Sequence, residues 1–483
     1  MQSPAFASEL PLVVDLDGTL IRSDLLLECG NRWMTQHPLG VWRLLAHLAQ
    51  GRASLKAWLA QVAAPDVSAL PYHEGLLAWL RAQRAAGRRL VLATASDGHL
   101  AQQVAEHLQL FDEVLASDGQ TNLKAQAKRD ALVARFGEQG FDYVGNDRAD
   151  VSVWASAAQA HVVSDDAALV QQARHTGRLG QVFGTERQPL VPTLFKAMRL
   201  HQWAKNLLVF VPLLAAHVYG DVRQVTLALL AFLAFGLAAS GVYLLNDLSD
   251  VEDDRHHPRK RQRPFAAGHL SLLLGWCLWP VLLLASLALA WQGVSMAFAA
   301  ALLVYVAVTT LYSFWLKQWV MVDVLTLAIL YTLRIVGGGV AIAVPLSFWL
   351  LLFSMFLFLS LALIKRYSEL KAAREAGRSS VLRGRGYAPD DLEMVSSLGG
   401  SAGFISVLVL ALYVQDSQTA HLYAAPHVIW ALCPLMLFWV SRAWLIAHRG
   451  QMHDDPIVFA LRDRMSWVIV ALMLVAVVLA RWL

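Results

Sequence analysis

This chain has few cysteines, no signal-peptide pattern in its first twenty residues and no long apolar run in its front part. Only three cysteines occur in 483 residues, and Cys29, Cys277 and Cys433 lie far apart, so the sequence predicts neither a disulfide framework nor a cysteine metal cluster. The first twenty residues have neither the basic start nor the apolar core of a signal peptide, so we expect the front of the chain to stay in the cytosol. Long apolar runs are absent before about residue 206, which predicts a soluble front domain.

The rest of the chain has a different composition. Residues 206–483 repeat apolar runs of about 17 to 25 residues, each able to cross ~30 Å of hydrocarbon. The expected spans are 206–220, 224–247, 270–291, 295–313, 319–343, 347–364, 395–415, 426–447 and 465–482. We therefore predict an all-α polytopic membrane bundle of about nine transmembrane helices.

Basic residues between these runs indicate the orientation. The connections after spans two, four, six and eight contain Arg255, Arg259, Lys260, Arg261 and Arg263, then Lys317, then the run 365–385, then Arg449, Arg462 and Arg464. The other connections have almost no Lys or Arg beyond Arg223. Because basic loops stay inside, we predict a multi-pass protein of the cytoplasmic (inner) membrane with its N-terminal domain in the cytosol and its C-terminus outside.

Three short apolar strands, 12–14, 90–93 and 143–144, each end at polar residues, and helical periodicity fills 22–85 between the first two. Strands that alternate with helices predict an α/β, Rossmann-like parallel sheet with its site at the strand carboxyl ends. The expected organisation is an α/β domain at 1–183 with a helical cap at 22–85, an amphipathic basic linker at 184–205, and the membrane domain at 206–483.

An acidic helix face follows the second span. Asn246, Asp247, Asp250 and Asp254 are spaced by three and four residues and share one side of a helix. Clustered carboxylates repel one another, and Mg²⁺ bound by one or two of them completes its shell with waters and phosphates. The basic residues that follow, among them Arg255, Lys260, Arg261 and Arg263, could bind a phosphate. The alternative is a solvated loop that only sets topology.

The fifth span contains two charged residues, Asp323 and Arg334. They are eleven residues apart, about three helical turns, so they project from the same face. Arginine inside a membrane helix is costly and usually faces a polar cavity. Arg334 therefore either contacts a substrate or pairs with an acid or a backbone carbonyl.

The acidic stretch resembles the NDxxDxxxD motif of the UbiA superfamily of intramembrane prenyltransferases. Other segments resemble its decaprenyl-phosphate phosphoribosyltransferase branch, and the resemblance covers about residues 190–483. It implies metal ligands at Asn246, Asp247, Asp250, Asp254 and Asp323, with Asp250 and Asp254 catalytic. It also implies substrate-binding roles for Lys205, Asn206, Arg255, Lys260, Arg261, Arg263, Tyr312, Lys317, Arg334, Lys365 and Arg366. This sequence departs from the superfamily at Leu327, where a second acid often stands.

The resemblance implies a Mg²⁺-dependent transfer that uses a polyprenyl lipid and a diphosphate-bearing small molecule. One hypothesis is transfer of 5-phosphoribosyl from phosphoribosyl diphosphate to polyprenyl phosphate. A second is transfer of a prenyl group to an aromatic acceptor, with the front domain structural. A third, from another class, is a transporter with a regulatory domain. The expected partners are the lipid, the diphosphate and the membrane, with no nucleic acid, and the sequence does not predict an oligomeric state.

The front stretch Asp15-Leu-Asp17-Gly-Thr resembles motif I of haloacid dehalogenase (HAD) superfamily phosphatases. The resemblance implies Asp15 as nucleophile and Asp17 as general acid and base, both catalytic, with Thr94 and Lys128 binding phosphate; Lys124 competes with Lys128 for that role. Asp15 and Asp150 would hold Mg²⁺. Motif IV departs from its usual form because Asn146 replaces an acid, which removes one charge from the metal site. We expect an active phosphatase that removes the ribose 5-phosphate, against the alternative of a structural relic.

Overall fold

The structure is a computed structural model that describes residues 10–117, 123–176, 178–377, 386–415, 423–452 and 455–482. The chain divides into two compact units, each treated by itself below. Unit 1 is Met1–Met198 with Tyr243–Leu278, and unit 2 is Arg199–Val242 with Trp279–Leu483. Helices α11 (Val222–Ser249) and α13 (Leu272–Gly293) each contribute residues to both units. The aspartate-rich stretch therefore belongs to the same compact unit as the front domain.

Unit 1 contains a six-stranded sheet in the order β3-β2-β1-β4-β5-β6, and all neighbouring strands are parallel. The strands are β1 Leu12–Val14, β2 Leu90–Asp97, β3 Glu113–Ser117, β4 Asp142–Gly145, β5 Gln159–Val163 and β6 Arg178–Phe183. The predicted α/β fold is confirmed. The strand order reverses between β1 and β4, which is where parallel α/β sheets place their sites.

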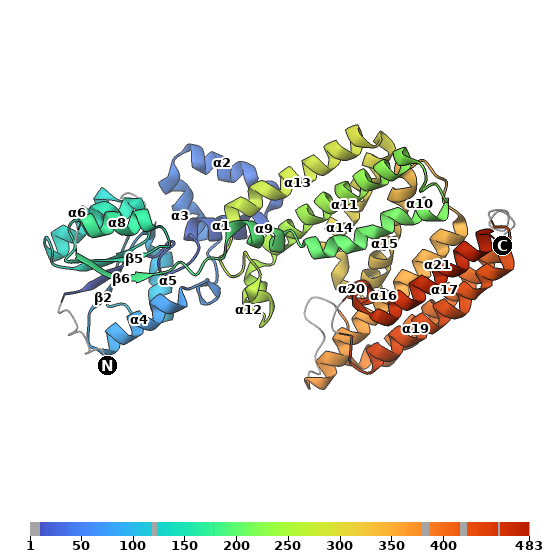
Figure 1. Ribbon diagram of the computed structural model, residues 1–483. Helices are drawn as coiled ribbons and strands as arrows, with labels where there is room; N and C mark the ends of the chain where they lie inside the picture. Colours follow the sequence, from blue (N-terminus) through green and yellow to red (C-terminus); the bar gives the residue numbers. More distant parts are fainter. Residues whose placement is uncertain are drawn as a thin grey trace. The chain divides into compact units, whose positions relative to one another are not determined.

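Helices cover both faces of this sheet (Figure 1). Successive strand residues point to opposite faces, so Leu12 and Val14 join one apolar core and Val13 joins the other. The first face is covered by α4 (Glu74–Ala85) and α5 (Gly98–Leu108). The second is covered by α6 (Gln126–Phe136), α7 (Val151–Trp154) and α8 (Ala167–Thr176).

The predicted helical cap lies between β1 and β2. It comprises α1 (Leu25–Gln36), η1 (Pro38–Gly40), α2 (Val41–Ala49), α3 (Arg52–Val62) and η2 (Val67–Ala69), followed by α4. Asp24 starts α1 as its N-cap, because its Oδ1 accepts hydrogen bonds from the Leu26 and Leu27 amides. The remaining helices of unit 1 are η3 (Arg148–Asp150), α9 (Leu190–Ala197), α12 (Val251–His256) and η5 (Lys260–Gln262).

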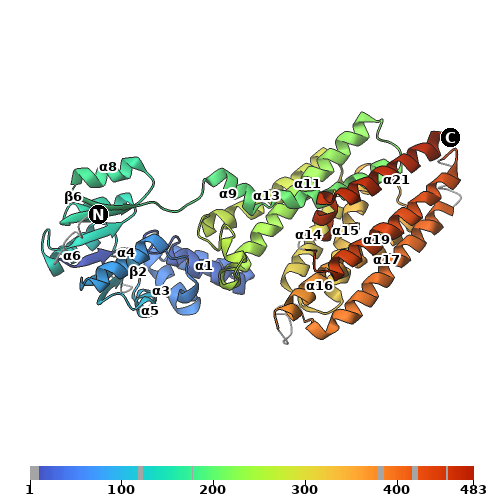
Figure 2. The same cartoon turned by 60° about the horizontal axis from the view of Figure 1, so that its bottom comes forward.

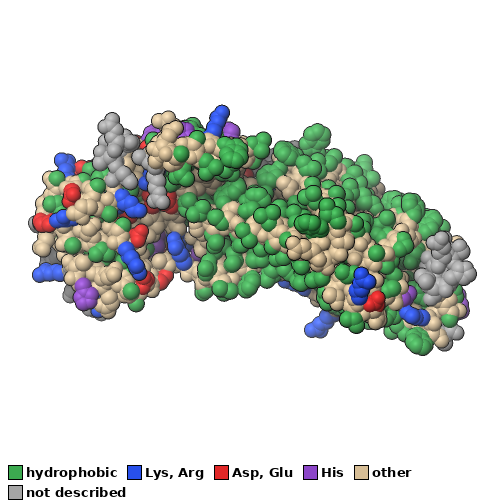
Figure 3. Space-filling view, turned by 90° about the horizontal axis from the view of Figure 1, so that it is seen from above, with side chains coloured by type: hydrophobic (Ala, Val, Ile, Leu, Met, Phe, Trp, Pro, Cys, Tyr) green, Lys and Arg blue, Asp and Glu red, His purple; other side chains and the backbone are tan. Residues whose placement is uncertain are grey.

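Unit 2 is helical. Its elements are η4 Leu200–Phe210, α10 Val211–Ala215, α14 Met296–Phe314, η6 Leu316–Gln318, α15 Val322–Ala341, α16 Phe348–Glu375, η7 Pro389–Asp391, α17 Leu392–Gln415, η8 Pro426–Ala431, α19 Leu432–His448, α20 Pro456–Arg462 and α21 Arg464–Trp482, with parts of α11 and α13. Helices α17, α19 and α21 run side by side in both cartoon views (Figure 2). Hydrophobic side chains cover most of the visible bundle surface, whereas charged ones gather over the α/β domain (Figure 3).

The expected number of spans needs one correction. Eight helices of the described residues are long and apolar enough to cross a membrane. The expected first span, 206–220, instead lies in the 3₁₀-helix η4 and the five-residue helix α10. Pro212 and the positive φ of His217 limit a continuous α-helix there. The side of the membrane on which the C-terminus lies, which rested on an odd number of spans, stays a prediction.

Segment η4 packs unusually closely against α15. A Cβ built on Gly338 would lie 2.1 Å from the Val209 carbonyl oxygen, a backbone atom that cannot move aside independently. Only glycine therefore permits this backbone approach. Gly400, in the middle of α17, has no neighbouring atom within 4 Å of its Cβ position.

We expect Gly338→Ala to destabilise the protein by about 1–3 kcal/mol, because either η4 or α15 must shift to remove the clash. Gly400→Ala is the matched control and should be neutral or stabilising, since alanine favours a helix by up to about 1 kcal/mol over glycine. Thermal unfolding of both purified variants in one detergent measures the difference. Equal melting temperatures for the two would contradict the close approach of η4 to α15.

Candidate functional site

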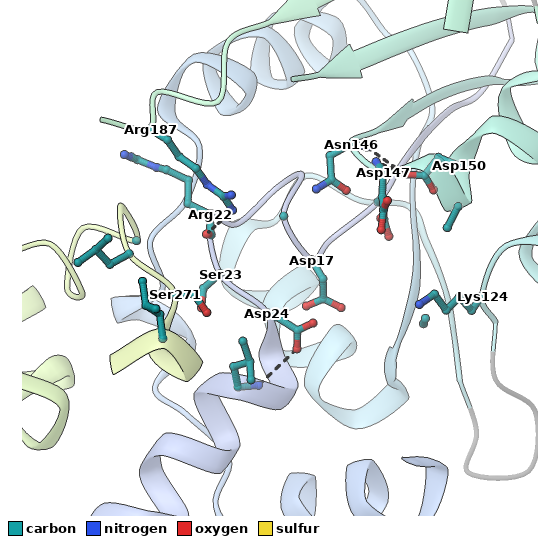
Figure 4. Close-up of a pocket in the computed structure, with 18 of the residues that line it drawn as sticks. Asp17, Arg22, Ser23, Asp24, Lys124, Asn146, Asp147, Asp150, Arg187 and Ser271 are labelled. Carbon is teal, nitrogen blue, oxygen red and sulfur yellow. Dashed lines mark hydrogen bonds between the residues drawn. The ribbon is translucent and has the colours of Figure 1, made fainter. Parts of the chain in front are cut away.

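A cavity of about 540 Å³ lies in unit 1 at the carboxyl ends of β1 and β4 (Figure 4). Its walls come from the loop after β1, the loop after β4, the cap, and the segment just before and at the start of α13. Parallel strands bring their carboxyl ends to one edge, which explains why Asp15, Asp17, Asn146 and Asp150 line it together although they are far apart in sequence.

Asp15, the expected nucleophile, is buried beside Lys128. The Nζ of Lys128 donates to Asp15 Oδ1 at 2.7 Å and to the Tyr143 hydroxyl at 3.0 Å. Burial raises the pKa of Asp15 to about 7, although Lys128 opposes the shift. Lys124, the competing candidate, also lines the cavity. The geometry thus gives Lys128 direct contact with Asp15.

Asp17, the expected acid and base, is held by three donors. Its Oδ1 accepts from the Leu25 amide at 2.8 Å, and its Oδ2 accepts from the hydroxyls of Ser96 at 2.6 Å and Thr94 at 3.4 Å. Burial raises the pKa of Asp17 to about 6, and Asp24 adds to the shift. A carboxyl group with a raised pKa can carry the proton that a general acid needs. The sequence did not indicate Ser96, which makes the shortest of these contacts.

The motif IV residues are occupied by contacts within the protein. Asp150 Oδ2 accepts from the amides of Asn146 and Asp147 at 3.0 and 3.1 Å, and its Oδ1 accepts from Tyr143 at 2.8 Å. Asn146 Oδ1 accepts from the Thr19 hydroxyl at 3.1 Å. Across the described ranges, no three His, Cys, Asp or Glu side chains form a group that could hold a metal. Both oxygens of Asp150 and one oxygen of Asp15 are thus hydrogen-bonded within the chain, which does not fit the Mg²⁺ expected at Asp15 and Asp150.

Cations and the segment just before α13 complete the cavity. Arg22 and Arg187 lie close together on one side of the view and Lys124 lies on the other (Figure 4). Ser271 lines the same cavity together with Gly268 to Leu270. Gly268 has a φ of +71°, and a Cβ there would lie 2.9 Å from the Arg22 Cβ, so glycine permits this close approach. Lys56 and Lys128 also line the cavity, so five basic side chains face five acidic ones there, and the basic ones could bind an anionic group.

The aspartate-rich stretch ends α11 and forms α12. Arg263 donates to Asp254 at 2.6 Å and to Asp247 at 3.2 Å, so one guanidinium joins two carboxylates. Asn246 donates to Asp250 at 3.2 Å. Asp247 and Asp254 are both almost fully buried. Buried carboxylates require cations, and here the chain supplies Arg263.

This acidic set fits a further cation. Asp254 Oδ1 is buried and has no hydrogen-bond partner within the described part of the chain, and Lys260 Nζ lies 3.8 Å from it. Burial raises the pKa of Asp254 to about 6, although Arg263 partly lowers it. Oxygen ligands of this kind suit Mg²⁺. Asp247, Asp250 and Asp254 do not form a three-ligand group in the described ranges, so one or two of them would hold a cation whose shell is completed by waters and phosphates.

Arg255, expected to bind substrate, is used otherwise. Its NH1 and NH2 groups bind both oxygens of Glu28 in α1, at 3.0 and 2.7 Å, and its Nε donates to the Ala266 carbonyl at 3.0 Å. The two side chains are only 5 and 2% exposed. Arg255 therefore joins α12 to the cap rather than facing a ligand. Glu28 gave no signal in the sequence beyond being a lone acid in an apolar helix.

In unit 2, Asp323 pairs with Arg366. Their side chains are 0% exposed and 2.9 Å apart, and Tyr387 donates to Asp323 at 2.7 Å. Glu369 also contacts Arg366. Each side chain neutralises the other in this arrangement, and the metal-ligand role expected for Asp323 and the substrate role expected for Arg366 stay predictions.

Arg334 is held by three acceptors inside unit 2. Its donors reach Asn206 at 2.9 Å, the Leu330 carbonyl at 2.6 Å and the Tyr305 hydroxyl at 2.8 Å. This geometry matches the alternative in which Arg334 pairs with a backbone carbonyl. The Asn206 amide and the Tyr305 phenol are its two further acceptors. Asn206 keeps a buried Nδ2 that finds no acceptor among the residues the structure describes.

Two predicted lysines meet at an acid that the sequence reasoning missed. Asp455 Oδ2 accepts from Lys205 at 2.8 Å, and Lys365 lies 3.6 Å away. Burial would raise the pKa of Asp455, but Lys205 and Lys365 outweigh it and lower it to about 2. The Asp455-Pro456 pair marks the start of α20 as an N-cap. The Asp-Pro pattern of a helix start can be recognised in the sequence, whereas the pairing of Asp455 with lysines far away in the chain cannot.

The remaining predicted residues have less defined roles. Tyr312 packs beside an apolar core of unit 2, Lys317 lies in η6, and Arg261 is exposed. Within the basic run 365–385, residues 378–385 lie outside the described residues.

Comparisons with known proteins identify two families in this chain. The model of the UbiA prenyltransferase family matches residues 207–467, and that of haloacid dehalogenase-like hydrolases matches residues 41–153. An uncharacterized protein of Sinorhizobium fredii, y4nM, is 38% identical over 98% of this chain and 92% of its own length. Such a relative spans both domains.

Two further relatives match only part of this chain. Nodulation protein NoeC of Azorhizobium caulinodans is 40% identical over 57% of this chain and 89% of its own length. Decaprenyl-phosphate phosphoribosyltransferase of Mycolicibacterium smegmatis is 34% identical over 60% of this chain and 93% of its own. A solved UbiA homologue from Archaeoglobus fulgidus, bound to GPP and Mg²⁺, is 17% identical over 59% of this chain and 99% of its own, with a TM-score of 0.44.

The fold and sites therefore define a multi-pass membrane enzyme with an N-terminal HAD-like hydrolase domain. The chain belongs to the UbiA prenyltransferase family.

The raised pKa of Asp17 predicts a pH-dependent cost to stability. The folded state binds the proton more tightly than the unfolded state, so stability is lost as pH rises from about 4 through about 6. We expect Asp17→Asn to abolish hydrolysis yet stabilise the protein above that window by about 1–3 kcal/mol. Melting temperatures measured from pH 4 to pH 8 test this, and an Asp17→Asn effect of the same size at both ends would contradict it.

Proposed function

We propose that this protein transfers 5-phosphoribosyl from phosphoribosyl diphosphate to a polyprenyl phosphate, and that its HAD-like domain then removes the 5-phosphate. The likeness to decaprenyl-phosphate phosphoribosyltransferases supports the first reaction. The acidic set of Asp247, Asp250 and Asp254 suits a Mg²⁺-diphosphate leaving group. A cation-lined cavity beside Asp15 supports the second reaction.

The proposed transfer exchanges one bond at ribose C1. A phosphate oxygen of the lipid attacks C1 while the bond from C1 to the diphosphate breaks, and pyrophosphate leaves. The attacking phosphate is already an anion, so no proton has to be removed first. Catalysis then depends on position and on neutralising the charge that develops on the leaving group.

Mg²⁺ held by one or two of Asp247, Asp250 and Asp254 would screen the charges of the diphosphate. Arg263 already bridges Asp247 and Asp254, and it would hold these carboxylates in place until the diphosphate binds. Lys260, 3.8 Å from Asp254, is half exposed and is the nearest further cation for a phosphate oxygen.

The proposed hydrolysis uses residues of the cavity alone. Asp15 attacks the phosphorus, the bond to the ribose 5-oxygen breaks, and Asp17 gives that oxygen its proton. Water then attacks the aspartyl phosphate, and Asp17 takes the proton back. Lys128 neutralises phosphate charge next to Asp15.

The position of one segment gives the strongest support for two consecutive reactions in this protein. Gly268 to Ser271, which line the hydrolase cavity, begin only five residues after Arg263, which binds the aspartate-rich stretch. Both segments lie within the UbiA-matched residues and within unit 1. A wall of the hydrolase cavity is thus built by the transferase sequence itself. Such a wall suits a substrate that the transferase produces.

Two alternative functions can be distinguished from phosphoribosyl transfer by the assay described below. Transfer of a prenyl group to an aromatic acceptor would also use the aspartate-rich stretch. The transporter hypothesis has less support, because the family to which the chain belongs is one of transferases.

Membranes that contain the protein should form a ribosylated lipid from labelled phosphoribosyl diphosphate and polyprenyl phosphate. Asp254→Asn should lower the rate at least about tenfold, since a lost ligand charge costs ~1.4 kcal/mol or more of transition-state stabilisation. Asp253→Asn, an exposed neighbour in α12, is the matched control and should keep the rate. The mass of the lipid product and the initial rate are measured.

Product formed instead from prenyl diphosphate and an aromatic acceptor would favour the second alternative. Retention of more than about a tenth of the rate in Asp254→Asn, at saturating Mg²⁺, would count against the metal role of the acidic set.

Asp15→Asn should cause the 5-phosphorylated ribosyl lipid to accumulate without slowing its formation. The nucleophile is lost, but the aspartate-rich stretch is untouched. Asp130→Asn, exposed on α6, is the control and should yield the dephosphorylated lipid. Mass spectrometry of the extracted lipid distinguishes the two products. Identical products from both variants would make the front domain a scaffold.

A further inference from the structure

The cap helix α2 presents an apolar face that nothing in the described chain covers. Leu39 of η1 and Trp42 of α2 are 91 and 74% exposed, and Leu45 and Leu48 are about half exposed. No residue of α2 is buried. One tryptophan and three leucines, exposed along η1 and α2, cost free energy in water unless another surface covers them.

The helix is nevertheless fixed in orientation. Leu44 packs against the core beneath it, and the His47 ring stacks on Trp58 of α3 with ring centroids 4.3 Å apart. Trp58 in turn meets Trp33 of α1 at 4.6 Å. The inner face of α2 is thus the one that packs on the cap. Its outer apolar face is presented by a rigid support.

The charged residues of the segment that contains α2 all have one sign. Residues 29–65 contain no Asp or Glu, whereas they contain Arg32, Arg43, Arg52 and Lys56. Arg43 is exposed beside Trp42. A short helix with tryptophan and leucine on one side and basic residues nearby is typical of segments that lie in the interface of anionic membranes.

The cap also contacts the ends of two spanning helices within unit 1. Asn31 of α1 donates to the Leu248 carbonyl in the last turn of α11 at 3.0 Å. Its Oδ1 accepts from Trp276, near the start of α13, at 2.9 Å. Both α11 and α13 are long and apolar enough to cross a membrane. The cap is therefore attached where two spans begin or end, at the level of a bilayer surface.

We infer that the outer face of α2, formed by Leu39, Trp42, Leu45 and Leu48, docks on the anionic surface of the bilayer that the spanning helices cross. This contact holds the cap, and with it the hydrolase cavity, against the lipid head groups. It does not depend on which reaction the protein catalyses. The bilayer is favoured over a second copy of the chain because the charged side chain of α2 is Arg43 and the helix has no acid, so two copies of this face would bring like charges together.

The test places a small fluorophore on this face of the full-length protein in vesicles of anionic lipid. Cys277 and Cys433, the two cysteines that are not buried, are first replaced by alanine. Bimane is then attached at Leu45→Cys, or at Gln102→Cys on the exposed side of α5 as the matched control. Quenching is measured with a lipid that carries a doxyl group near the head group, and separately with acrylamide in the water.

At position 45 we expect lipid quenching about threefold stronger than at position 102, with correspondingly weaker quenching by acrylamide. Adding Trp42→Ser and Leu48→Ser should weaken lipid quenching and strengthen acrylamide quenching at position 45. The apolar contact is then lost, while Leu44 and His47 still hold the helix. The elution volume of each variant in detergent checks that it remains folded.

Two results would overturn the inference. Equal lipid quenching at positions 45 and 102 would show that α2 does not touch the bilayer. Protection of position 45 from both quenchers would show that protein covers this face, either from a second copy or from another part of the chain.

Discussion

The ion pair between Arg255 and Glu28 is the interaction on which the organisation of unit 1 depends. Both side chains are almost completely buried and bind through two parallel hydrogen bonds. Removing either partner would leave an uncompensated buried charge, which costs about 3–5 kcal/mol. The pair joins α1 of the HAD-like domain to α12 of the aspartate-rich stretch. It makes the hydrolase cap a structural support for residues of the transferase.

The same rule governs the other buried acids. Asp15 has Lys128, Asp254 has Arg263, Asp323 has Arg366 and Asp455 has Lys205. Burial penalises each charge, and a positioned cation offsets that cost for each of these four acids. The pKa of each acid depends on how far the neighbouring cations offset the cost of burial. Asp455 keeps a pKa of about 2 beside two lysines, whereas the pKa of Asp254 stays raised, at about 6. Asp254 also has an oxygen without a hydrogen-bond partner in the described part of the chain, so a further cation there would stabilise its charge.

Much of the architecture followed from local sequence patterns. Strands β1, β2 and β4 and the acidic face at Asp247, Asp250 and Asp254 are encoded by apolar runs and by helical spacing, which act over a few residues. The partners of Arg255 and Lys205 are hundreds of residues away, so spacing carries no record of them. The prediction of a first span at 206–220 was wrong. An apolar run of the right length for a span can form a 3₁₀-helix where its backbone packs closely on Gly338.

Asn146 bears on how the hydrolase site can work. In this position an acid would repel Asp15 and Asp150, whose charges are already offset by a single lysine. The amide instead accepts a hydrogen bond from Thr19 and adds no charge. The site thereby keeps the ion pair of Asp15 with Lys128, and the cost is a weaker set of ligands for a divalent cation. Phosphate charge must then be met mainly by side chains, and Arg22, Lys56, Lys124 and Arg187 already line the cavity. Five basic and five acidic side chains line this cavity, and the amide of Asn146 preserves that balance.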